Sequence, residues 1–195
     1  MNLFKTTAVC TLGIILATAC GGPKEKSPEK AETAGNMQAT EAYEDMGTAT
    51  VGTRIQQDDR FNTLSRTLEQ ANLEGMLNED LPYTLFAPSD AAFSQLPAGT
   101  LDHLFEETGK PALISLLTYH IVAGEHSAGD ISEAIKSHDG SYTLETLQGK
   151  RITFTDTDNG VLLTDIQGDT AHIVRPDLRA SNGLIHEIDQ VMSDQ

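Results

Sequence analysis

One serine lies where a hydrolase would place its nucleophile. Ser89 follows the apolar run 83–87 and Pro88, it precedes a helix-like pattern, and six histidines elsewhere in the chain could supply a base. A nucleophilic serine of this kind sits in a strained strand-to-helix turn, G-x-S-x-G, in which the glycines relieve crowding. The local sequence here is Ala-Pro-Ser-Asp-Ala, with neither glycine. The sequence therefore favours Ser89 as a helix N-cap, whose oxygen accepts a backbone N–H, and predicts no catalytic residue.

A second cluster, residues 156–160, contains carboxylates that could attract a cation. The segment Asp-Thr-Asp-Asn-Gly resembles part of a calcium loop, but the complete loop needs further ligands and a glutamate some residues beyond the glycine. Position 165 is Asp, within a strand-like run. An Asn-Gly pair between two alternating runs is a strong hairpin signal. We therefore interpret the segment as a hairpin turn and predict no metal site.

The histidines are at positions 103, 120, 126, 138, 172 and 186. None of them shows the His-x-x-x-His or His-x-His spacing that zinc sites use. His120 differs from the others because it follows Tyr119 at the end of an apolar helical pattern, where a buried ring needs a hydrogen-bond partner. We expect a structural role for it. No glycine-rich phosphate loop is present, so neither a cofactor nor an enzymatic activity is predicted.

The charge balance excludes one class of partner. The chain has 13 basic and 29 acidic residues among 195, a formal net charge of −16. A field of this sign repels nucleic acids. Apolar residues make up 38% of the sequence, which is sufficient for one soluble folded domain with additional length. The acidic surface is interpreted as a source of solubility.

The first 19 residues have the pattern of a secretory signal. Lys5 precedes an apolar run over residues 8–17, which is too short to span a bilayer as a helix. The run ends in Leu-Ala-Thr-Ala before Cys20, which resembles the bacterial lipoprotein cleavage box. The resemblance implies that residues 1–19 are a signal peptide and that Cys20 carries acyl chains, with an ordinary secretory signal as the alternative. Cys10 would be removed, which leaves the mature chain without a free thiol.

A lipid on Cys20 would attach the protein to a membrane without crossing it, because two or more acyl chains give stable anchoring. Gly21 stands where an aspartate would resemble an inner-membrane retention signal, so the outer membrane of a Gram-negative bacterium is favoured. Residues 20–47 hold Gly, Pro, Glu, Lys, Ser and Thr with almost no aliphatic residues. Such a segment is typical of a flexible tether, with an average reach of roughly 30 Å.

The remaining residues, 48–195, are predicted to form one domain in which helices come first and strands later. Residues 61–77 show helical spacing, 83–87 resemble a short buried strand, and two more helices are predicted around Leu104 and, after Lys110-Pro111, around Leu117. Another short helix is expected over residues 130–137. Beyond it, period-two runs predict strands around residues 142–146, 152–154 and 161–163, and two final strands flank a Ser-Asn-Gly turn. This order predicts an α+β fold with a mixed or antiparallel sheet.

Three segments are similar to signatures of the fasciclin domain. They are YTLFAPSDAAF at 83–93 with Leu96-Pro97, LLTYHIV at 116–122 with Gly124, and SNGLIHEID at 181–189. Their order and spacing correspond to one complete domain, about residues 48 to 193. The resemblance implies a wedge of β-strands with several helices packed along one side. It also implies a role in extracellular adhesion or protein contacts, without catalysis.

In animal members of this family, integrin contact is assigned to an Asp-Ile pair before the closing signature and to the Tyr-His region. The matching positions here are Asp177-Leu178 and Tyr119-His120. Leu178 replaces the isoleucine, and Arg175 stands where the animal motif has an acid. These four residues are candidate contacts for a protein or glycan at the cell envelope, with core packing of Tyr119 and His120 as the alternative. A second functional hypothesis is a periplasm-facing domain that binds a small ligand or glycan in a cleft.

Overall fold

The structure is a computed structural model that describes residues 48–193. The predicted signal peptide, Cys20 and the tether lie outside the described residues. The helices are α2 (Val51–Gln57), the 3₁₀ helix η2 (Asp59–Phe61), α3 (Asn62–Ala71), α4 (Glu74–Leu77), α5 (Asp90–Phe93), α6 (Thr100–Phe105), α7 (Lys110–Tyr119) and α8 (Ala128–Ser137). The strands are β1 (Tyr83–Pro88), β2 (Ile121–Ala123), β3 (Ser141–Glu145), β4 (Arg151–Thr157), β5 (Gly160–Thr164), β6 (Thr170–Ala180) and β7 (Gly183–Ile188).

These strands form one mixed sheet in the order β2-β1-β7-β6-β5-β4-β3. β1 and β7 are parallel, and the other neighbouring strands are antiparallel. β2 at one edge meets the residues that follow β3 at the other edge, through a bridge between Val122 and Thr146 and a hydrogen bond of 2.8 Å from Leu147 N to Ile121 O. Pairing of the edges satisfies backbone groups that would otherwise be open to another chain. The sheet is thus nearly closed, and the predicted α+β class with a mixed sheet is confirmed.

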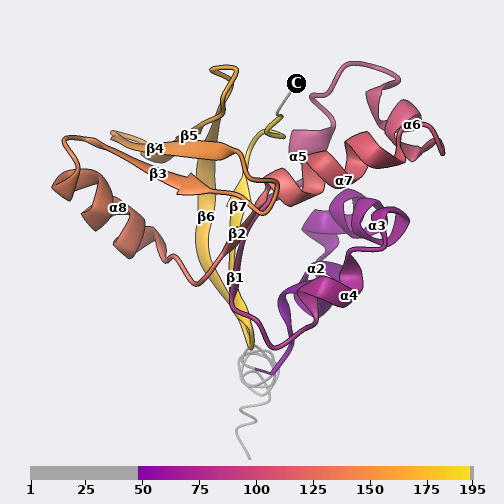
Figure 1. Ribbon diagram of the computed structural model, residues 1–195, viewed down its shortest axis with the longest axis horizontal. Coiled ribbons are helices and arrows are strands. Elements are labelled where there is room, and N and C mark those ends of the chain that lie inside the picture. Colours follow the sequence, from indigo (N-terminus) through magenta and orange to yellow (C-terminus); the bar gives the residue numbers. More distant parts are fainter. Residues whose placement is uncertain (1–47, 194–195) are drawn as a thin grey trace, which may run out of the picture. The chain divides into compact units, whose positions relative to one another are not determined.

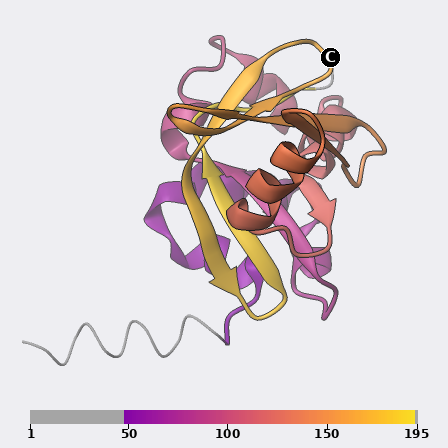
Figure 2. The ribbon, with the colours of Figure 1, turned by 90° about the vertical axis from the view of Figure 1, so that its left-hand side faces the viewer.

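The central strands separate two apolar clusters. Side chains alternate across β1, so Leu85 and Ala87 join the cluster of α2, α3 and α7, whereas Phe86 joins the cluster of α8 and β3–β6. Every residue of β1 and β7 is buried, as expected for strands covered on both faces. Figure 1 shows α2 to α7 along one side of the sheet, which confirms the expected helical layer. It also shows α8 on the other side, and Figure 2 shows α8 in front of the strands.

Three details differ from the sequence-based expectations. The helix predicted over residues 61–77 is divided, because Asn72 adopts a left-handed conformation (φ 56°) and ends α3 before α4 begins. Asparagine tolerates this conformation better than most residues. α2 and β2 were not predicted, since each is short and its burial depends on distant segments.

Within residues 48–193, no helix is long and apolar enough to cross a membrane.

The turn between β6 and β7 connects the helical layer to the sheet. The Asn182 side chain accepts a hydrogen bond from Val51 N (2.8 Å) and donates to Leu77 O (2.9 Å) and Glu79 O (2.7 Å). Gly183 has a φ of 154°, and a Cβ at this position would lie 1.9 Å from the carbonyl oxygen of Tyr83. Only glycine fits so close to another backbone. The Asn-Gly pair therefore fixes the start of α2 and the end of α4 against β1 and β7.

Candidate functional site

Ser89 is a helix cap, as the sequence predicts. Its backbone is extended (φ −72°, ψ 166°), and its hydroxyl accepts a hydrogen bond from Ala92 N at 3.4 Å in the first turn of α5. The neighbouring Asp90 carboxylate accepts a shorter bond, 2.7 Å, from Thr63 N at the start of α3. The Ser-Asp pair of the first signature therefore caps two helices, α5 locally and α3 from a distance.

Tyr119 is completely buried at the end of α7. Its ring belongs to the apolar cluster of α8 and β3–β6, and its hydroxyl donates to Arg151 O at 3.0 Å. A buried phenol needs such a partner. The residue lies in the core and connects α7 to the first residue of β4.

His120 is buried beside it and binds two backbone groups. Met192 N donates to Nε2 at 3.0 Å, so the proton must be on Nδ1, which lies 2.7 Å from Leu116 O and donates to it. Burial lowers the pKa of His120 from 6.5 to about 4, against the opposing effects of the Leu116 bond and of Asp165. The ring is therefore neutral at pH 7 and joins α7 to the C-terminal segment. This placement agrees with the packing alternative for the Tyr-His pair.

A buried carboxylate holds the same C-terminal segment. Asp165 accepts bonds from Gln167 N and Asp169 N, both at 2.9 Å, within the turn after β5, and from Ser193 N at 3.3 Å. Gln95 adds a bond of 3.0 Å to Asp189 O. Residues 189–193 are thus attached to the domain at several points, although they form no helix or strand.

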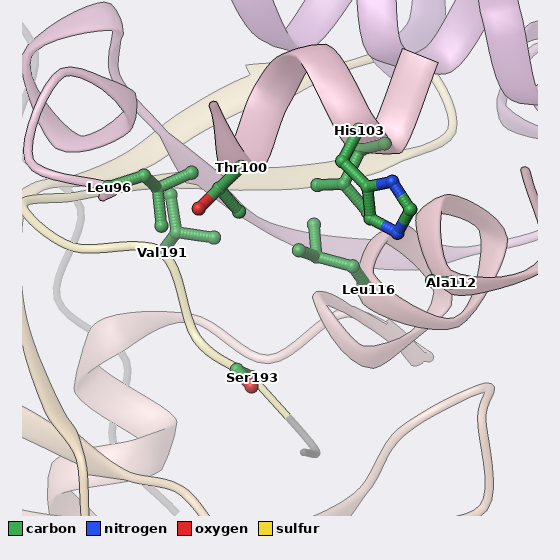
Figure 3. Close-up of a pocket in the computed structure, with 8 residues that line it drawn as sticks. Leu96, Thr100, His103, Ala112, Leu116, Val191 and Ser193 are labelled. Atoms are coloured by element: carbon green, nitrogen blue, oxygen red, sulfur yellow. The ribbon is translucent and has the colours of Figure 1, made fainter. Parts of the chain in front are cut away.

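This segment forms one wall of a cleft with α6 and α7, with a volume of about 250 Å³. Most of its lining is aliphatic, and the lining residues are Leu96, Thr100, His103, Leu104, Ala112, Leu116, Val191 and Ser193. In Figure 3, Leu96, Thr100 and Val191 lie together, while His103 lies near Leu116. The alternative hypothesis named a cleft but not its residues, because the walls of this cleft come from three separate parts of the sequence.

The second candidate region is the irregular middle of β6. Its pairing with β7 shifts register between Ile173 and Arg175 and again between Arg175 and Leu178. Asp177 has a φ of 58°, and its carboxylate accepts a bond from Ala128 N (3.0 Å) at the start of α8. Leu178 is half-buried and packs against the helical cluster. Such bulges redirect side chains, and here they direct the Asp177 carboxylate to α8.

His186 holds this bulge from β7. Asp177 N donates to its Nδ1 at 3.2 Å, so the proton is on Nε2, which donates to His126 O at 2.8 Å. The ring is fully buried and stacks on Phe86 with centroids 5.4 Å apart. Burial lowers the pKa of His186, with Asp177 acting in the opposite direction. Sequence reasoning missed this role, although a histidine among the apolar residues of the closing signature was a usable signal.

The surface beside the bulge combines apolar and charged groups. Val174 is 48% exposed, and Arg175 and Pro176 are exposed with it. Arg175 Nε lies 3.7 Å from Glu187 Oε2, and Arg60 binds the same carboxylate. An open depression of about 360 Å³ adjoins this strand, lined by Asn159, His172, Ile173, Val174 and Asp189. We call residues 174–178 the β6 contact segment.

The predicted hairpin turn at 158–160 is confirmed, since Thr157 and Gly160 pair across β4 and β5. Asp156 accepts a bond of 3.1 Å from Ser132 Oγ of α8. Within the described part of the chain, no group of three or more His, Cys, Asp or Glu side chains could hold a metal ion.

Comparison with known proteins identifies relatives. A family model described as Fasciclin domain matches residues 59–194. The uncharacterized protein sll1735 of Synechocystis is 35% identical over 135 residues, which cover 69% of this chain and 90% of that protein. Immunogenic protein MPB70 of Mycobacterium bovis is 29% identical over 97% of this chain and 92% of its own. Cell surface glycolipoprotein MPB83 of the same species is 34% identical over 67% of this chain and 56% of its own.

The fold is also similar to a solved structure, a FAS1 domain pair from the insect cell adhesion molecule Fasciclin I. The TM-score is 0.60 at 19% identity, over 75% of this chain and 51% of that chain. The present chain thus corresponds to about half of the pair. At this identity the likeness concerns the fold alone.

Proposed function

Because the chain belongs to the fasciclin-domain family, we propose that it is a non-catalytic module that mediates adhesion or protein–protein interaction at the cell envelope. One relative supports this proposal by its description, since MPB83 is a cell surface glycolipoprotein. The module recognises a protein or glycan partner through its surface. Its acidic charge of −16 disfavours nucleic acid as that partner.

The membrane attachment through Cys20 is part of the proposal. The lipoprotein-like box before Cys20 supports it, and the tether of residues 20–47 would hold the domain away from the bilayer. Incorporation of labelled palmitate into the wild type, and its loss in Cys20→Ala together with release from membranes, is the expected result. Palmitate-free protein, or a Cys20→Ala variant that stays membrane-bound, would refute lipid anchoring without affecting the contact proposal.

The observation that carries the contact proposal is the solvent-exposed β6 contact segment on a fixed backbone. Val174 and Pro176 expose apolar surface, whereas the backbone beside them is held by the bond from Asp177 N to His186. Binding energy usually concentrates in a few such side chains on rigid supports. We assign Val174, Arg175 and Pro176 the direct contact. Asp177 and Leu178 contribute through their exposed portions and by positioning the segment.

The test uses photo-crosslinking of the intact protein on living cells, followed by identification of partners by mass spectrometry. Val174→Asp should reduce capture of the main partner at least about fivefold, because a charge replaces an apolar contact. Leu81→Asp is the matched control, since Leu81 is 52% exposed but lies before β1, at the opposite end of β7. Equal capture by both variants would refute the assignment of the β6 contact segment. Unchanged attachment and aggregation of a deletion strain would refute the adhesive role itself.

A second candidate function is the binding of a small ligand. The observation that favours it is the cleft of about 250 Å³ between α6, α7 and residues 191–193. Ligand sites are typically concave and mostly apolar with a few polar groups, and this cleft has that character. A thermal-shift screen is the direct test, because ligand at 100 times its dissociation constant adds about 2.7 kcal/mol of stability.

A further inference from the structure

We propose that the cleft between α6, α7 and residues 191–193 binds an uncharged, mainly apolar molecule of about ten non-hydrogen atoms. The proposal specifies the ligand class of the second candidate function and rests on it. It is independent of the adhesive role, which uses the β6 contact segment on other residues.

The lining provides apolar surface that water still reaches. Leu104 is buried, whereas the other aliphatic side chains of the lining are only half-buried. These half-buried residues are Leu96, Ala112, Leu116 and Val191. Removal of such surface from water favours binding in proportion to the area covered. Figure 3 shows these side chains around the cleft, with Ala112 and Leu116 from α7, Leu96 from the segment before α6 and Val191 from the C-terminal segment.

The size of the cleft limits the ligand. An apolar cavity of about 150 Å³ holds one benzene molecule, so a volume of about 250 Å³ corresponds to about ten non-hydrogen atoms. Typical drug-binding pockets start at about 300 Å³. A bicyclic ring or a short branched chain therefore matches the volume, whereas a disaccharide or a long acyl chain exceeds it.

Buried polar groups hold the C-terminal wall in place. His120 accepts the bond from Met192 N (3.0 Å), and Asp165 accepts the bond from Ser193 N (3.3 Å). Met192 and Ser193 directly follow Val191, whose side chain faces the cleft. The wall is thus fixed before a ligand arrives, which reduces the entropy lost on binding.

The charges around the cleft favour an uncharged ligand. Among the eight lining residues, His103 is the only ionisable one, and no lysine or arginine is present. Glu106 Oε2 lies 3.4 Å from His103 Nδ1, so a carboxylate stands beside the mouth. With the net charge of −16, this arrangement disfavours anions. Few polar groups converge in the cleft, and its lining contains no Phe, Tyr or Trp on which a sugar ring could stack.

The test is titration of the ¹⁵N-labelled full chain with 2-naphthol, which has the proposed size and is uncharged at neutral pH. Binding is expected with a dissociation constant on the order of 0.1 mM, with chemical shifts that change at Thr100, Ala112 and Val191. The anion 2-naphthoate should bind at least about tenfold more weakly, and cellobiose should produce no shift. Equal binding of the anion, binding of the sugar, or no response to 2-naphthol would overturn the proposal.

A matched pair of helix variants locates the site. Ala112→Leu narrows the cleft from α7 and should weaken 2-naphthol binding at least about tenfold. Ala134→Leu is the control, because Ala134 is also half-buried but lies on α8, on the other side of the sheet. Circular dichroism establishes that both variants are folded. If 2-naphthol binding is weakened equally in both variants, or is weakened in neither, the ligand binds elsewhere. Crosslinking through the β6 contact segment should be unchanged in Ala112→Leu, which separates this result from the adhesive role.

Discussion

The cleft and the β6 contact segment differ in surface character but are supported by the same chemistry. The cleft is concave and aliphatic, whereas the β6 contact segment is exposed and partly charged. Each region contains backbone groups that do not pair with a neighbouring strand. In each region a buried neutral histidine accepts a hydrogen bond from one of these backbone N–H groups. His120 serves residues 191–193, and His186 serves the bulge at Asp177. Irregular backbone can therefore be made rigid by one side chain that donates and accepts.

The two histidines differ in what depends on them. His120 holds a terminal segment that forms no helix or strand, and the other hydrogen bonds of this segment to the domain include those with Asp165 and Gln95. His186 lies inside a strand paired on both sides, between β1 and β6. Loss of the first should release a wall of the cleft. Loss of the second should loosen the bulge and the start of α8 but leave the sheet in place.

The largest expected effect is that of His120→Ala. The variant leaves Leu116 O and Met192 N without their partner and creates a buried cavity, so the free energy of unfolding should fall by about 3 kcal/mol. Urea denaturation measures this loss, and hydrogen exchange should show faster exchange at Met192 N than in the wild type.

The exposed His103, whose side chain is 69% accessible, is the control, and His103→Ala should change stability by less than about 0.5 kcal/mol. His186→Ala should accelerate exchange at Ala128 N and Asp177 N instead of Met192 N. The same exchange pattern in both buried variants would contradict the separation of the two regions.

The pH dependence sharpens the comparison. Burial lowers the pKa of His120 from 6.5 to about 4, so between these values the unfolded chain takes up a proton that the folded chain does not. Stability is therefore greatest above pH 6.5 and decreases as the pH falls towards 4, by about 3 kcal/mol at most for a shift of this size. His186, whose pKa is also lowered, adds a decrease of the same sign. The pKa values of the Asp58 and Asp130 carboxyl groups are also lowered, and the stability that these groups contribute is lost mainly below pH 3.8, under the range in which the histidines act.

Urea midpoints measured between pH 4 and 7.5 test this prediction. His120→Gln keeps a donor and an acceptor but cannot titrate, so its urea midpoint should change less with pH than that of the wild type. An identical dependence would show that His120 takes up its proton at the same pH in the folded and unfolded chains, which would contradict the lowered pKa of the buried ring.

The next effect concerns Asp177. Asp177→Ala removes the acceptor for Ala128 N and places an ordinary residue at φ 58°, so stability should fall by about 1–2 kcal/mol. Asp177→Asn keeps an acceptor and tolerates the left-handed conformation, and it should be within about 0.5 kcal/mol of wild type. Thermal unfolding measures both. If Asp177→Asn is stable but captures less partner, the carboxylate itself makes the contact, and if capture is unchanged its role is positional.

The sequence predicted the elements whose causes are local. The cap at Ser89, the hairpin at 158–160 and the turn before Gly183 each follow from residue types within a few positions. α2 could not be predicted in this way, because its start is fixed by Asn182, which is 131 positions from Val51. His186 belonged to a recognised signature, yet its partner His126 is 60 positions away.

The functional regions were harder to predict from the sequence than the fold, for the same reason. The cleft brings together α6, α7 and residues 191–193, and no short pattern in the sequence relates their side chains. The Tyr-His pair was recognisable as a motif, but its burial depends on Met192 and Arg151. A contact surface is also determined by its partner, and the partner produces no regular residue pattern in this sequence.

The smallest expected effect belongs to Ser89, the residue that first suggested chemistry. Its hydroxyl lies 3.4 Å from Ala92 N, a long hydrogen bond in a helix of four residues, so Ser89→Ala should cost about 0.5–1 kcal/mol. Asp90→Ala should cost more, because Asp90 binds Thr63 N at 2.7 Å and joins α5 to α3. Neither variant should change capture by the β6 contact segment, and a fluorophosphonate probe should not label the wild type. Labelling that is lost in Ser89→Ala would show a nucleophile and refute the capping account, because a hydroxyl that serves only as a cap has no base to activate it.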